Sequence, residues 1–282
     1  MINAGFTCPN IDGTVAYGGC TFCSVKGSGD CAGNPKDDLT RQFQEVKGRM
    51  HEKWPDASYI GYFQAFSNTH APLSVLKEKY DAVMNADEGI VGLSIATRAD
   101  CLPDDVVDYL GELAERTHLW VELGLQTIHD KTGKLINRGH DYATFVAGVD
   151  KLRAKNIDVI VHIINGLPGE TTDMMLETAK AVGALDIQGI KIHLLHVIQG
   201  TPMHRMLDKG MMQLMNRDEY VELVADQLEV IPEHIVIHRL TGDGIREELV
   251  GPWWSINKWE ILNQIDDTLR NRNTHQGRLA RP

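Results

Sequence analysis

The sequence predicts an α/β fold in which a parallel sheet is covered by helices. Strand-like and helix-like segments alternate along most of the 282 residues, and such alternation is typical of parallel strands joined by helices. The expected strands are apolar on one face only, whereas a parallel strand covered on both faces should be almost wholly apolar. The apolar face must meet the helices, so the polar face is expected to line the interior of a barrel.

The expected elements follow one another at regular spacing. Strands are expected at residues 57–65, 90–96, 119–125, 157–164, 188–195 and 234–240. Helices are expected at residues 37–54, 73–86, 103–116, 141–155, 170–184 and 216–230. Several helix starts carry clear signals, such as Pro103 followed by Asp104 and Asp105. Residues 1–6 are too short for a full strand, and we expect a clipped first strand there.

Polar residues on the inward face of four strands indicate a functional interior. They are Ser94, Glu122, Gln126, His162, Lys191 and His193. An unpaired charge in such an interior would be very costly, so Glu122 and Lys191 are expected to contact each other or a bound ligand. One inward histidine is more often a hydrogen-bonded core residue than a catalyst, but several polar residues on four strands favour a polar, functional interior.

Size and composition are those of a soluble globular protein, with 43% hydrophobic and 24% charged residues. The length suits one large barrel or two small domains. No apolar run approaches the roughly 20 residues that a membrane helix needs, so we expect no membrane partner and a cytoplasmic location. The net charge of −11 argues against broad, non-specific binding of nucleic acid and leaves room for a local basic patch.

Three thiols near the N-terminus are the main candidates for metal binding. Cys8, Cys20 and Cys23 have the spacing C-x11-C-x2-C, and Gly18 and Gly19 allow the loop between them to turn tightly. Iron–sulfur clusters are held by cysteine thiolates, normally four of them. A cluster with three protein ligands would leave one iron open to a substrate or cofactor. The loop taken alone favours such a cluster over zinc only modestly.

The alternative from another functional class is a non-enzymatic zinc or redox-sensing protein. Cys31 follows Cys23 closely enough for Cys8, Cys20, Cys23 and Cys31 to form a closed tetrahedral zinc site. A disulfide is disfavoured because the chain has five cysteines, an odd number. The zinc alternative leaves the polar interior unexplained.

The cysteine loop and the barrel with a polar interior together resemble the radical S-adenosylmethionine (SAM) superfamily. Its usual spacing is C-x3-C-x2-C, and the longer spacing here resembles the Elongator-catalytic-subunit-like branch, of the YhcC/YtqA type. The matching segments are residues 62–69, 92–98, 122–127, 136–140, 166–170, 191–196 and 254–259. The resemblance implies a partial (βα)6 TIM-type barrel of parallel strands over residues 1–243, with the cluster loop at 8–35. A C-terminal extension, residues 244–282, would pack on this core.

The chain departs from the family pattern in three places. Gln64-Ala65-Phe66 stands where the family carries Gly-Gly-Glu, the motif that holds the amino group of the methionine moiety. Ala99 stands where a proline is expected. The resemblance also implies a stretch before Met1, so the first barrel strand is expected to be truncated.

The resemblance implies that Cys8, Cys20 and Cys23 hold a [4Fe–4S] cluster whose open iron is chelated by SAM. One-electron reduction then yields a 5′-deoxyadenosyl radical, which takes a hydrogen atom from the substrate. The residues expected to contact SAM are Phe22, Gln64, Ser94, Thr97, Glu122, Gln126, Arg138, Asn165, Gly166 and Pro168. Lys191, His193 and His162 are candidates for substrate contact or proton transfer.

Some of these residues receive specific roles from the resemblance. Arg138 suits the SAM carboxylate because a guanidinium matches a planar carboxylate. Glu122 and Gln126 suit the ribose hydroxyls or the sulfonium. Phe22 is expected near the adenine. Cys101, at a helix start, is a weaker candidate for a thiol with a lowered pKa.

The Elongator-like resemblance implies a substrate, the position-5 side chain of the tRNA wobble uridine. Residues 269–282 include four arginines and no acidic residue: Arg270, Arg272, Arg278 and Arg281. Trp253, Trp254 and Trp259 precede them, and basic residues beside aromatic ones suit phosphates and unstacked bases. A radical SAM enzyme acting on a small metabolite or peptide is the alternative. The expected partners are SAM, a one-electron donor of flavodoxin or ferredoxin type, and tRNA.

Overall fold

The computed structural model describes residues 1–27, 29, 32–242, 244 and 246–280. Six strands form one sheet in the order β1-β2-β3-β4-β5-β7, with parallel pairing from β1 to β3 and from β4 to β7. The chain divides into two compact units. The first comprises residues 1–17, 25–124 and 146–159, and the second comprises residues 18–24, 125–145 and 160–282.

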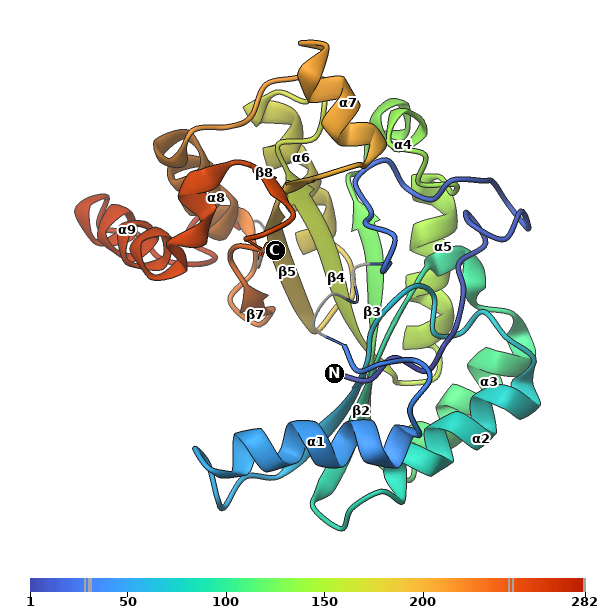
Figure 1. Cartoon of the computed structure of the whole chain (residues 1–282). Coiled ribbons are helices and arrows are strands. Elements are labelled where there is room, and N and C mark those ends of the chain that lie inside the picture. The colour runs from blue at the N-terminus through green and yellow to red at the C-terminus, as the bar shows by residue number, and fades with distance from the viewer. Residues whose placement is uncertain (28, 30–31, 243, 245, 281–282) are drawn as a thin grey trace. The chain divides into compact units, whose positions relative to one another are not determined.

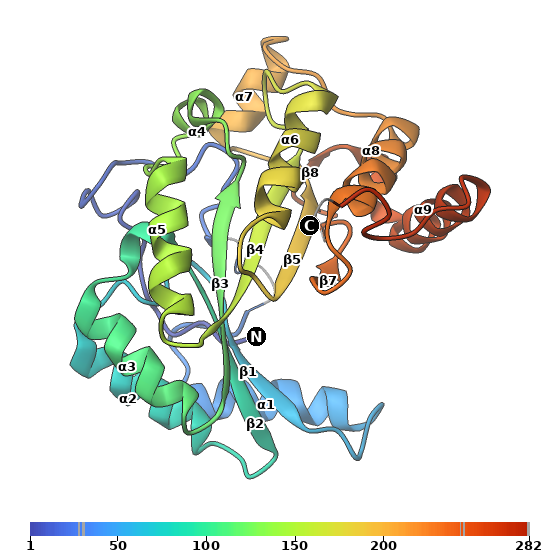
Figure 2. The same cartoon turned by 180° about the vertical axis from the view of Figure 1, so that it is seen from behind.

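The first unit packs helices against the strands β1, β2 and β3 (Figure 1). Its strands are β1 (Tyr59–Phe63), β2 (Ile90–Thr97) and β3 (His118–Gln126) as far as Gly124. Its helices are α1 (Leu39–His51), α2 (Leu73–Met84), η1 (Ala99–Cys101), α3 (Asp104–Ala114) and the second part of α5 (Tyr142–Arg153). Helices α2 and α3 lie side by side (Figure 2), and their Tyr80 and Tyr109 rings stack with centroids 6.3 Å apart.

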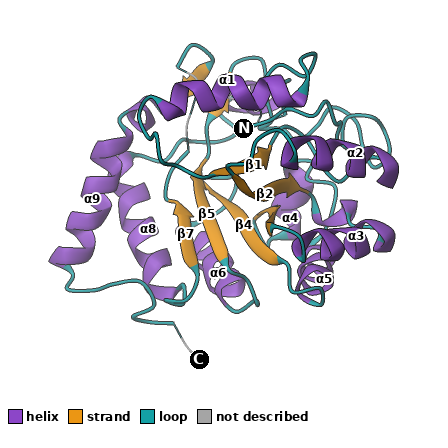
Figure 3. Cartoon of the chain, turned by 90° about the horizontal axis from the view of Figure 1, so that it is seen from below, coloured by secondary structure: helices purple, strands orange, loops and turns teal. Residues whose placement is uncertain are grey.

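The second unit contains the remaining strands and helices. Its strands are β4 (Asp158–Asn165) from Ile160 onward, β5 (Gly189–Leu194), β7 (Val236–Arg239), and the antiparallel pair β6 (Val197–Ile198) and β8 (Leu249–Gly251). Its helices are α4 (Asp130–Leu135), α6 (Thr172–Gly183), α7 (Pro202–Asp208), α8 (Arg217–Val230), η2 (Trp253–Ile256) and α9 (Lys258–Asn271), with the start of α5. Helices α8 and α9 lie side by side (Figure 3).

All six expected strands are present, and the expected clipped strand at the N-terminus is a single bridge. Ile2 pairs with Phe63 in parallel, and its amide donates to the Tyr62 carbonyl at 2.7 Å. The apolar side of β3 is fully covered, since Val121, Leu123 and Leu125 have no exposed surface. The division into residues 1–243 and 244–282 stays a prediction, and residue 243 lies outside the described residues.

Three helices were not expected from the sequence. Helix α4 has six residues, too few to show a periodic apolar pattern. Helix α7 carries a start signal that was overlooked, because the Thr201 hydroxyl accepts from the His204 amide and Pro202 occupies the first turn. Helix α9 buries Ile261 and Ile265, one turn apart. None of the helices described is long and apolar enough to cross a membrane.

Asp87 fastens α1 to the turn before β2. Its carboxylate accepts from Lys47 Nζ at 2.5 Å, Gln44 Nε2 at 3.1 Å and the Gly89 amide at 2.9 Å. These donors hold the pKa of Asp87 down at about 2, the Lys47 hydrogen bond contributing most. A carboxylate whose folded-state pKa is lowered stabilises the protein above its unfolded pKa and loses this contribution as pH falls.

The substitution Asp87→Asn is therefore expected to destabilise the protein at pH 7 by about 1 kcal/mol, the upper range for a partly exposed ion pair. The difference from the wild type should stay constant from pH 7 to pH 5. It should then narrow as pH falls from about 4 towards 2, because the wild-type carboxylate becomes protonated. Urea unfolding at several pH values measures this difference. A difference that does not change with pH would contradict the assigned role of the charge.

Candidate functional site

The second half of the cysteine loop is held by backbone hydrogen bonds in the second unit. Gly18 and Gly19 have φ values of 80° and 71°, which favour glycine. The Cys23 amide donates to the Cys20 carbonyl at 3.0 Å, so the two half-buried cysteines share one tight turn. Thr21 fixes this turn in place, because its amide donates to the Ile136 carbonyl and its carbonyl accepts from the Met203 amide, both at 2.9 Å.

Phe22, between the two cysteines, packs against a buried apolar cluster of the same unit. The cluster consists of Ile136, Leu167, Leu195, Val197, Met203 and Met212. The side chain of Asn137 donates to the Gly19 carbonyl at 2.8 Å and adds a further contact between the loop and the end of α4. Phe22 therefore holds the loop on its unit, and its expected contact with adenine stays a prediction.

The first half of the loop, with Cys8, belongs to the first unit. The Cys8 carbonyl accepts from the Ile11 and Asp12 amides. The Asp12 carboxylate accepts from the hydroxyl and amide of Thr14 and from His70 Nε2 at 2.8 Å. The Thr14 hydrogen bonds are the main reason that the pKa of Asp12 is lowered to about 2. Asp12 therefore stays ionised at neutral pH and ties the loop to the segment after β1.

The donor set suits an iron–sulfur cluster, because cysteine thiolates are the usual ligands of such clusters and Cys20 and Cys23 share one tight turn. Across the described residues, no three His, Cys, Asp or Glu side chains are grouped as metal ligands. Cys8 and the Cys20–Cys23 pair belong to different units. The three-cysteine ligand set is thus a prediction that this structure does not test. Cys31, the fourth ligand in the zinc alternative, lies outside the described residues.

Glu122 lies buried on the polar face of the first unit, where it accepts hydrogen bonds from three neutral groups. Its carboxylate accepts from Tyr62 at 2.7 Å, Ser94 at 2.8 Å and Trp120 Nε1 at 3.1 Å. The strand register explains this arrangement, since Tyr62, Ser94 and Trp120 are successive partners across β1, β2 and β3. Hydrogen bonds to a carboxylate are stronger than those between neutral groups, which offsets part of the cost of burial.

The loop after β1, where the family motif is replaced, has an uncommon backbone. Ala65 and Phe66 have φ values of 104° and 60°, which residues with a Cβ seldom adopt. The Phe66 amide donates to the Gly27 carbonyl at 3.0 Å, so this turn holds the end of the cysteine loop. The Gln64 amide donates to the Ile2 carbonyl.

Thr97, at the end of β2, takes part in a buried hydroxyl chain. The Thr69 hydroxyl donates to the Cys101 carbonyl at 2.6 Å, so the Thr97 hydroxyl, 2.6 Å away, must donate to Thr69. Burial raises the pKa of the Cys101 thiol to about 12. The suggestion of a lowered pKa at this position is therefore wrong, because loss of solvent outweighs any favourable effect of the helix start.

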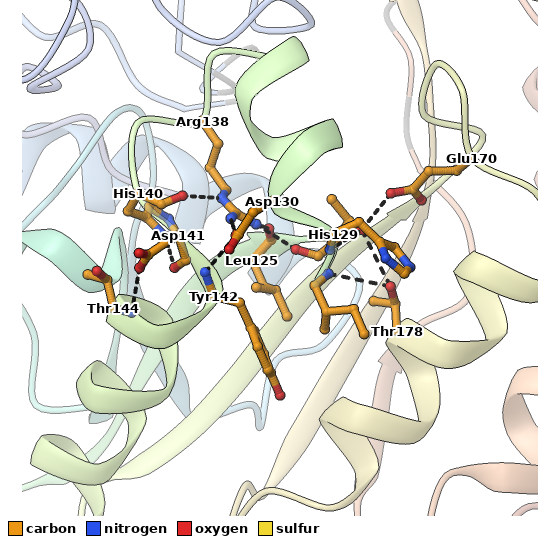
Figure 4. Close-up of polar contacts among 12 residues, drawn as sticks. Leu125, His129, Asp130, Arg138, His140, Asp141, Tyr142, Thr144, Glu170 and Thr178 are labelled. Carbon is orange, nitrogen blue, oxygen red and sulfur yellow. Dashed lines mark hydrogen bonds and ion pairs between the residues drawn. The ribbon is translucent and has the colours of Figure 1, made fainter.

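Arg138 has its guanidinium inside the second unit, 1% exposed (Figure 4). Its Nη1 donates to the carbonyls of Leu125 at 2.9 Å and Thr127 at 2.5 Å. Its Nε donates to the His140 carbonyl at 2.7 Å, and its Nη2 donates to the Asp130 carboxylate at 2.9 Å. Burial lowers the pKa of Arg138 and Asp130 opposes this; the side chain remains charged because its usual pKa is so high.

The two carbonyls held by Nη1 flank Gln126, the last residue of β3. Gln126 has a φ of 64°, in the left-handed region. Arg138 bridges the chain on both sides of this residue and so fixes the direction in which β3 ends. Gly133 leaves the necessary room, because a Cβ there would lie 2.8 Å from Nη2. Arg138 thus positions Gln126, and its own contact with the SAM carboxylate stays a prediction.

Glu170 lies beside this network, at the end of the Gly-Leu-Pro-Gly-Glu turn. It accepts from the Thr127 hydroxyl at 2.5 Å. Burial raises the pKa of Glu170, and the Thr127 hydrogen bond opposes the rise. The Thr127 hydroxyl also accepts from the His129 amide, so the start of α4 and the turn after β4 are linked through one side chain.

Asn165 at the end of β4 is paired with a residue that sequence reasoning missed. Asn165 Nδ2 donates to Gln227 Oε1 at 2.8 Å, and Gln227 Nε2 donates to Asn165 Oδ1 at 2.9 Å. Both side chains are buried. Gly166 follows with a φ of 89°. No local signal on α8 marks Gln227, which is a single polar residue on an apolar helix face.

Lys191, His162 and His193 lie together on one face of the second unit. His162 and Lys191 are register partners across β4 and β5. The rings of His162 and His193 have centroids 5.1 Å apart. Lys191 is buried and only 8% exposed. The structure thus brings together the three residues expected to contact the substrate.

Comparison with known proteins decides the family. The family model of the radical SAM superfamily matches residues 14–182, and that of the radical SAM C-terminal domain matches residues 187–271. The chain belongs to the radical SAM superfamily. Members of this superfamily use a [4Fe–4S] cluster and SAM.

Three relatives indicate the branch of the superfamily to which the chain is similar. Uncharacterized protein YtqA of Bacillus subtilis is 61% identical over 278 residues, which cover 99% of this chain and 86% of that protein. Protein YhcC of Escherichia coli is 34% identical over 285 residues, covering 100% and 90%. The tRNA uridine(34) acetyltransferase of Methanocaldococcus infernus is 25% identical over 171 residues, covering 60% of this chain and 32% of that protein. The predicted YhcC/YtqA-type branch is confirmed.

A solved structure confirms the predicted fold class. The Elp3 protein of Methanocaldococcus infernus, with its N-terminus deleted, superposes with a TM-score of 0.69 at 17% identity. The match covers 84% of this radical SAM chain and 59% of that protein's chain. Together with the strand order, this likeness establishes a partial α/β barrel.

Replacement of Arg138 tests its structural role in the radical SAM fold. Arg138→Met is expected to destabilise the protein by about 3–5 kcal/mol, because it removes the side-chain donors from three backbone carbonyls and the cation that pairs with Asp130. Arg116→Met is the matched control, since Arg116 forms an exposed pair with Asp81 and should cost about 1 kcal/mol or less. Urea unfolding compares the two variants. Equal small losses would show that Arg138 does not hold the end of β3.

Proposed function

We propose that this radical SAM enzyme modifies the wobble uridine side chain of tRNA. The observation that carries the proposal is the similarity to the tRNA uridine(34) acetyltransferase over 60% of this chain. That match covers 32% of the relative. We therefore propose the uridine substrate for this chain and do not propose acetyl transfer. In this proposal a one-electron donor of flavodoxin or ferredoxin type supplies the electron.

Cys8, Cys20 and Cys23 are the proposed ligands of the [4Fe–4S] cluster. The cluster with SAM supplies a 5′-deoxyadenosyl radical that abstracts hydrogen. Residues of the chain itself position these groups. The tight turn from Cys20 to Cys23 sets two ligands, and Glu122 offers a carboxylate oriented by three donors. Arg138 fixes the backbone at Gln126.

Two tryptophans are the proposed stacking surface for RNA bases. Trp253 and Trp259 are 58% and 78% exposed, and an exposed indole can stack on an unpaired base. Trp254 has a structural role instead, because its Nε1 donates to the Met215 carbonyl and its ring lies on Tyr220.

The arginines of the C-terminal segment contribute less than the sequence suggested. Arg272 pairs with Glu222 and Asp226 on α8, and Arg270 pairs with Asp267 at 3.0 Å. Their charge is thus largely compensated by the protein itself. Arg281 lies outside the described residues. We therefore assign RNA contact to the two tryptophans rather than to an arginine patch.

The cluster assignment predicts the effect of removing single thiols. Cys20→Ala and Cys23→Ala, reconstituted without oxygen, are expected to lose most of the iron and all formation of 5′-deoxyadenosine. Cys101→Ala is the control and should keep both, since that thiol is buried and structural. Iron and sulfide analysis, the EPR spectrum of the reduced protein with and without SAM, and a 5′-deoxyadenosine assay measure these properties.

The zinc alternative makes a different prediction for the same experiment. One zinc per chain, no iron and no SAM cleavage in the wild type would contradict the cluster assignment. Cys31→Ala separates the two cases, because it would release zinc from a closed site and would leave a three-cysteine cluster unchanged.

The RNA assignment predicts tRNA binding that weakens steeply as salt is added. Trp259→Ala is expected to weaken it about tenfold, the effect of losing one base stacked on an aromatic ring. Trp54→Ala, which removes another exposed indole, is the control and should bind like the wild type. Fluorescence anisotropy with unmodified tRNA measures binding, and nucleoside mass spectrometry after incubation with SAM and a reductant measures modification.

If 5′-deoxyadenosine forms but tRNA neither binds nor changes in mass, the substrate assignment is wrong. A small metabolite or a peptide would then be the substrate class to examine.

A further inference from the structure

The turn after β4, residues 166–170, is connected to the Cys20–Cys23 turn by two routes within the second unit. The first route is apolar. Leu167 is 2% exposed and belongs to the buried cluster against which Phe22 packs. The Glu170 amide donates to the Leu167 carbonyl at 3.2 Å, so the turn is closed by its own backbone. The side chain that follows this closed turn, Glu170, provides the second route.

Glu170 accepts from two buried hydroxyl groups. One is that of Thr127, just after β3, at 2.5 Å (Figure 4), and the other is that of Thr132 on α4. Thr127 has no exposed surface and Thr132 is 4% exposed. Buried hydroxyl groups need hydrogen-bond partners. Glu170 therefore ties the turn after β4 both to the end of β3 and to α4.

From Thr132 the contact continues along the backbone to the cysteine turn. The Ile136 amide donates to the Thr132 carbonyl at 2.9 Å, and the Ile136 carbonyl accepts from the Thr21 amide at 2.9 Å. Thr21 lies between Cys20 and Cys23. Each step is one hydrogen bond, so the position of Thr132 sets the position of the acceptor that holds Thr21.

Helix α4 depends on such outside contacts for its position. It has six residues and contains Gly133. Isolated helices of this length are marginal in water, and glycine in a helix interior lowers stability further. The start of α4 is held by Asp130, which pairs with Arg138. Its middle is held by Thr132, whose hydroxyl donates to Glu170.

We propose that Glu170 is a positioning residue, which fixes the Cys20–Cys23 turn through Thr132 and Ile136. This role rests on the proposed function in one respect, because the two thiols matter as ligands of the cluster. Under that assignment, Glu170 acts on the cofactor through the turn that carries two of its three ligands. Its loss would displace these ligands without removing either thiol.

Hydrogen–deuterium exchange of the full-length protein, purified without iron, tests this role. Glu170→Ala is expected to speed exchange of the Thr21 and Ile136 amides about tenfold, because two hydrogen bonds of ordinary net strength are lost and exchange follows local opening. Glu170→Gln keeps one acceptor oxygen and should give a smaller rise, about threefold. Glu177→Ala is the control, since it removes a side chain on α6 that is 62% exposed, and it should leave exchange unchanged.

The pattern of exchange separates positioning from a general loss of stability. A rise confined to residues 18–24, 127–136 and 166–170 supports the proposal. Unchanged exchange at residues 18–24 would overturn it. An equal rise in β4 and β5 would also overturn it, because the substitution would then weaken the whole unit.

Thr132→Val covers the case in which Glu170→Ala does not fold. This variant removes the hydroxyl group and keeps a side chain of similar shape. It is expected to speed exchange of the Thr21 and Ile136 amides about threefold, since one hydrogen bond is lost. Exchange equal to that of the wild type in this variant would rule out the route through α4.

Reconstitution without oxygen gives a second measurement. Glu170→Ala should bind less iron than the wild type, and the EPR spectrum of its reduced form should lose the shift caused by SAM. Faster exchange at residues 18–24 with unchanged iron and EPR spectra would overturn the connection to the cluster. A wild type that binds no iron would contradict the proposed cluster, whereas the exchange experiment would still decide whether Glu170 holds the turn. The two failures are therefore distinguishable.

Discussion

The end of strand β3 depends on one buried guanidinium. The carbonyls of Leu125 and Thr127 flank the left-handed Gln126, and buried carbonyls need donors. Arg138 donates to both of them and to the His140 carbonyl, and the Thr127 amide donates to the Leu125 carbonyl as well. Its partner Asp130 accepts the Tyr142 amide as well, so the end of β3, the start of α4 and the start of α5 share one network. A lysine could not replace this planar set of donors.

The polar face of the first unit buries a carboxylate, and that of the second unit buries an ammonium group. In the first unit, the Glu122 carboxylate accepts hydrogen bonds from a hydroxyl, a phenol and an indole, which help to fix its orientation. In the second unit, Lys191 has imidazoles on the same face. Each polar face therefore buries one charged side chain among residues that the strand register brings beside it.

The fold class was predictable because strand alternation and one-sided apolar patterning are local properties of the sequence. The polar face was predictable for the same reason, and residues such as Glu122 and Lys191 are buried as expected. The partners of these residues were not predictable, because they depend on register between strands. Ser94 and Trp120 meet Glu122 only through the pairing of β2 with β3. The contacts of Arg138 with backbone carbonyls were not predictable, since no sequence signal reveals them; its contact with the SAM carboxylate stays a prediction. Gln227 was missed because its partner Asn165 lies 62 residues away in the chain.

Electrostatics restrict how this protein could recognise RNA. A net charge of −11 repels a polyanion, and Arg270 and Arg272 near the C-terminus are paired with carboxylates of α9 and α8. Extended contact with a phosphate backbone is therefore unfavourable. Stacking on exposed indoles is much less sensitive to net charge. Recognition by a few stacking contacts is therefore the mode that would reconcile this acidic radical SAM protein with the proposed RNA substrate.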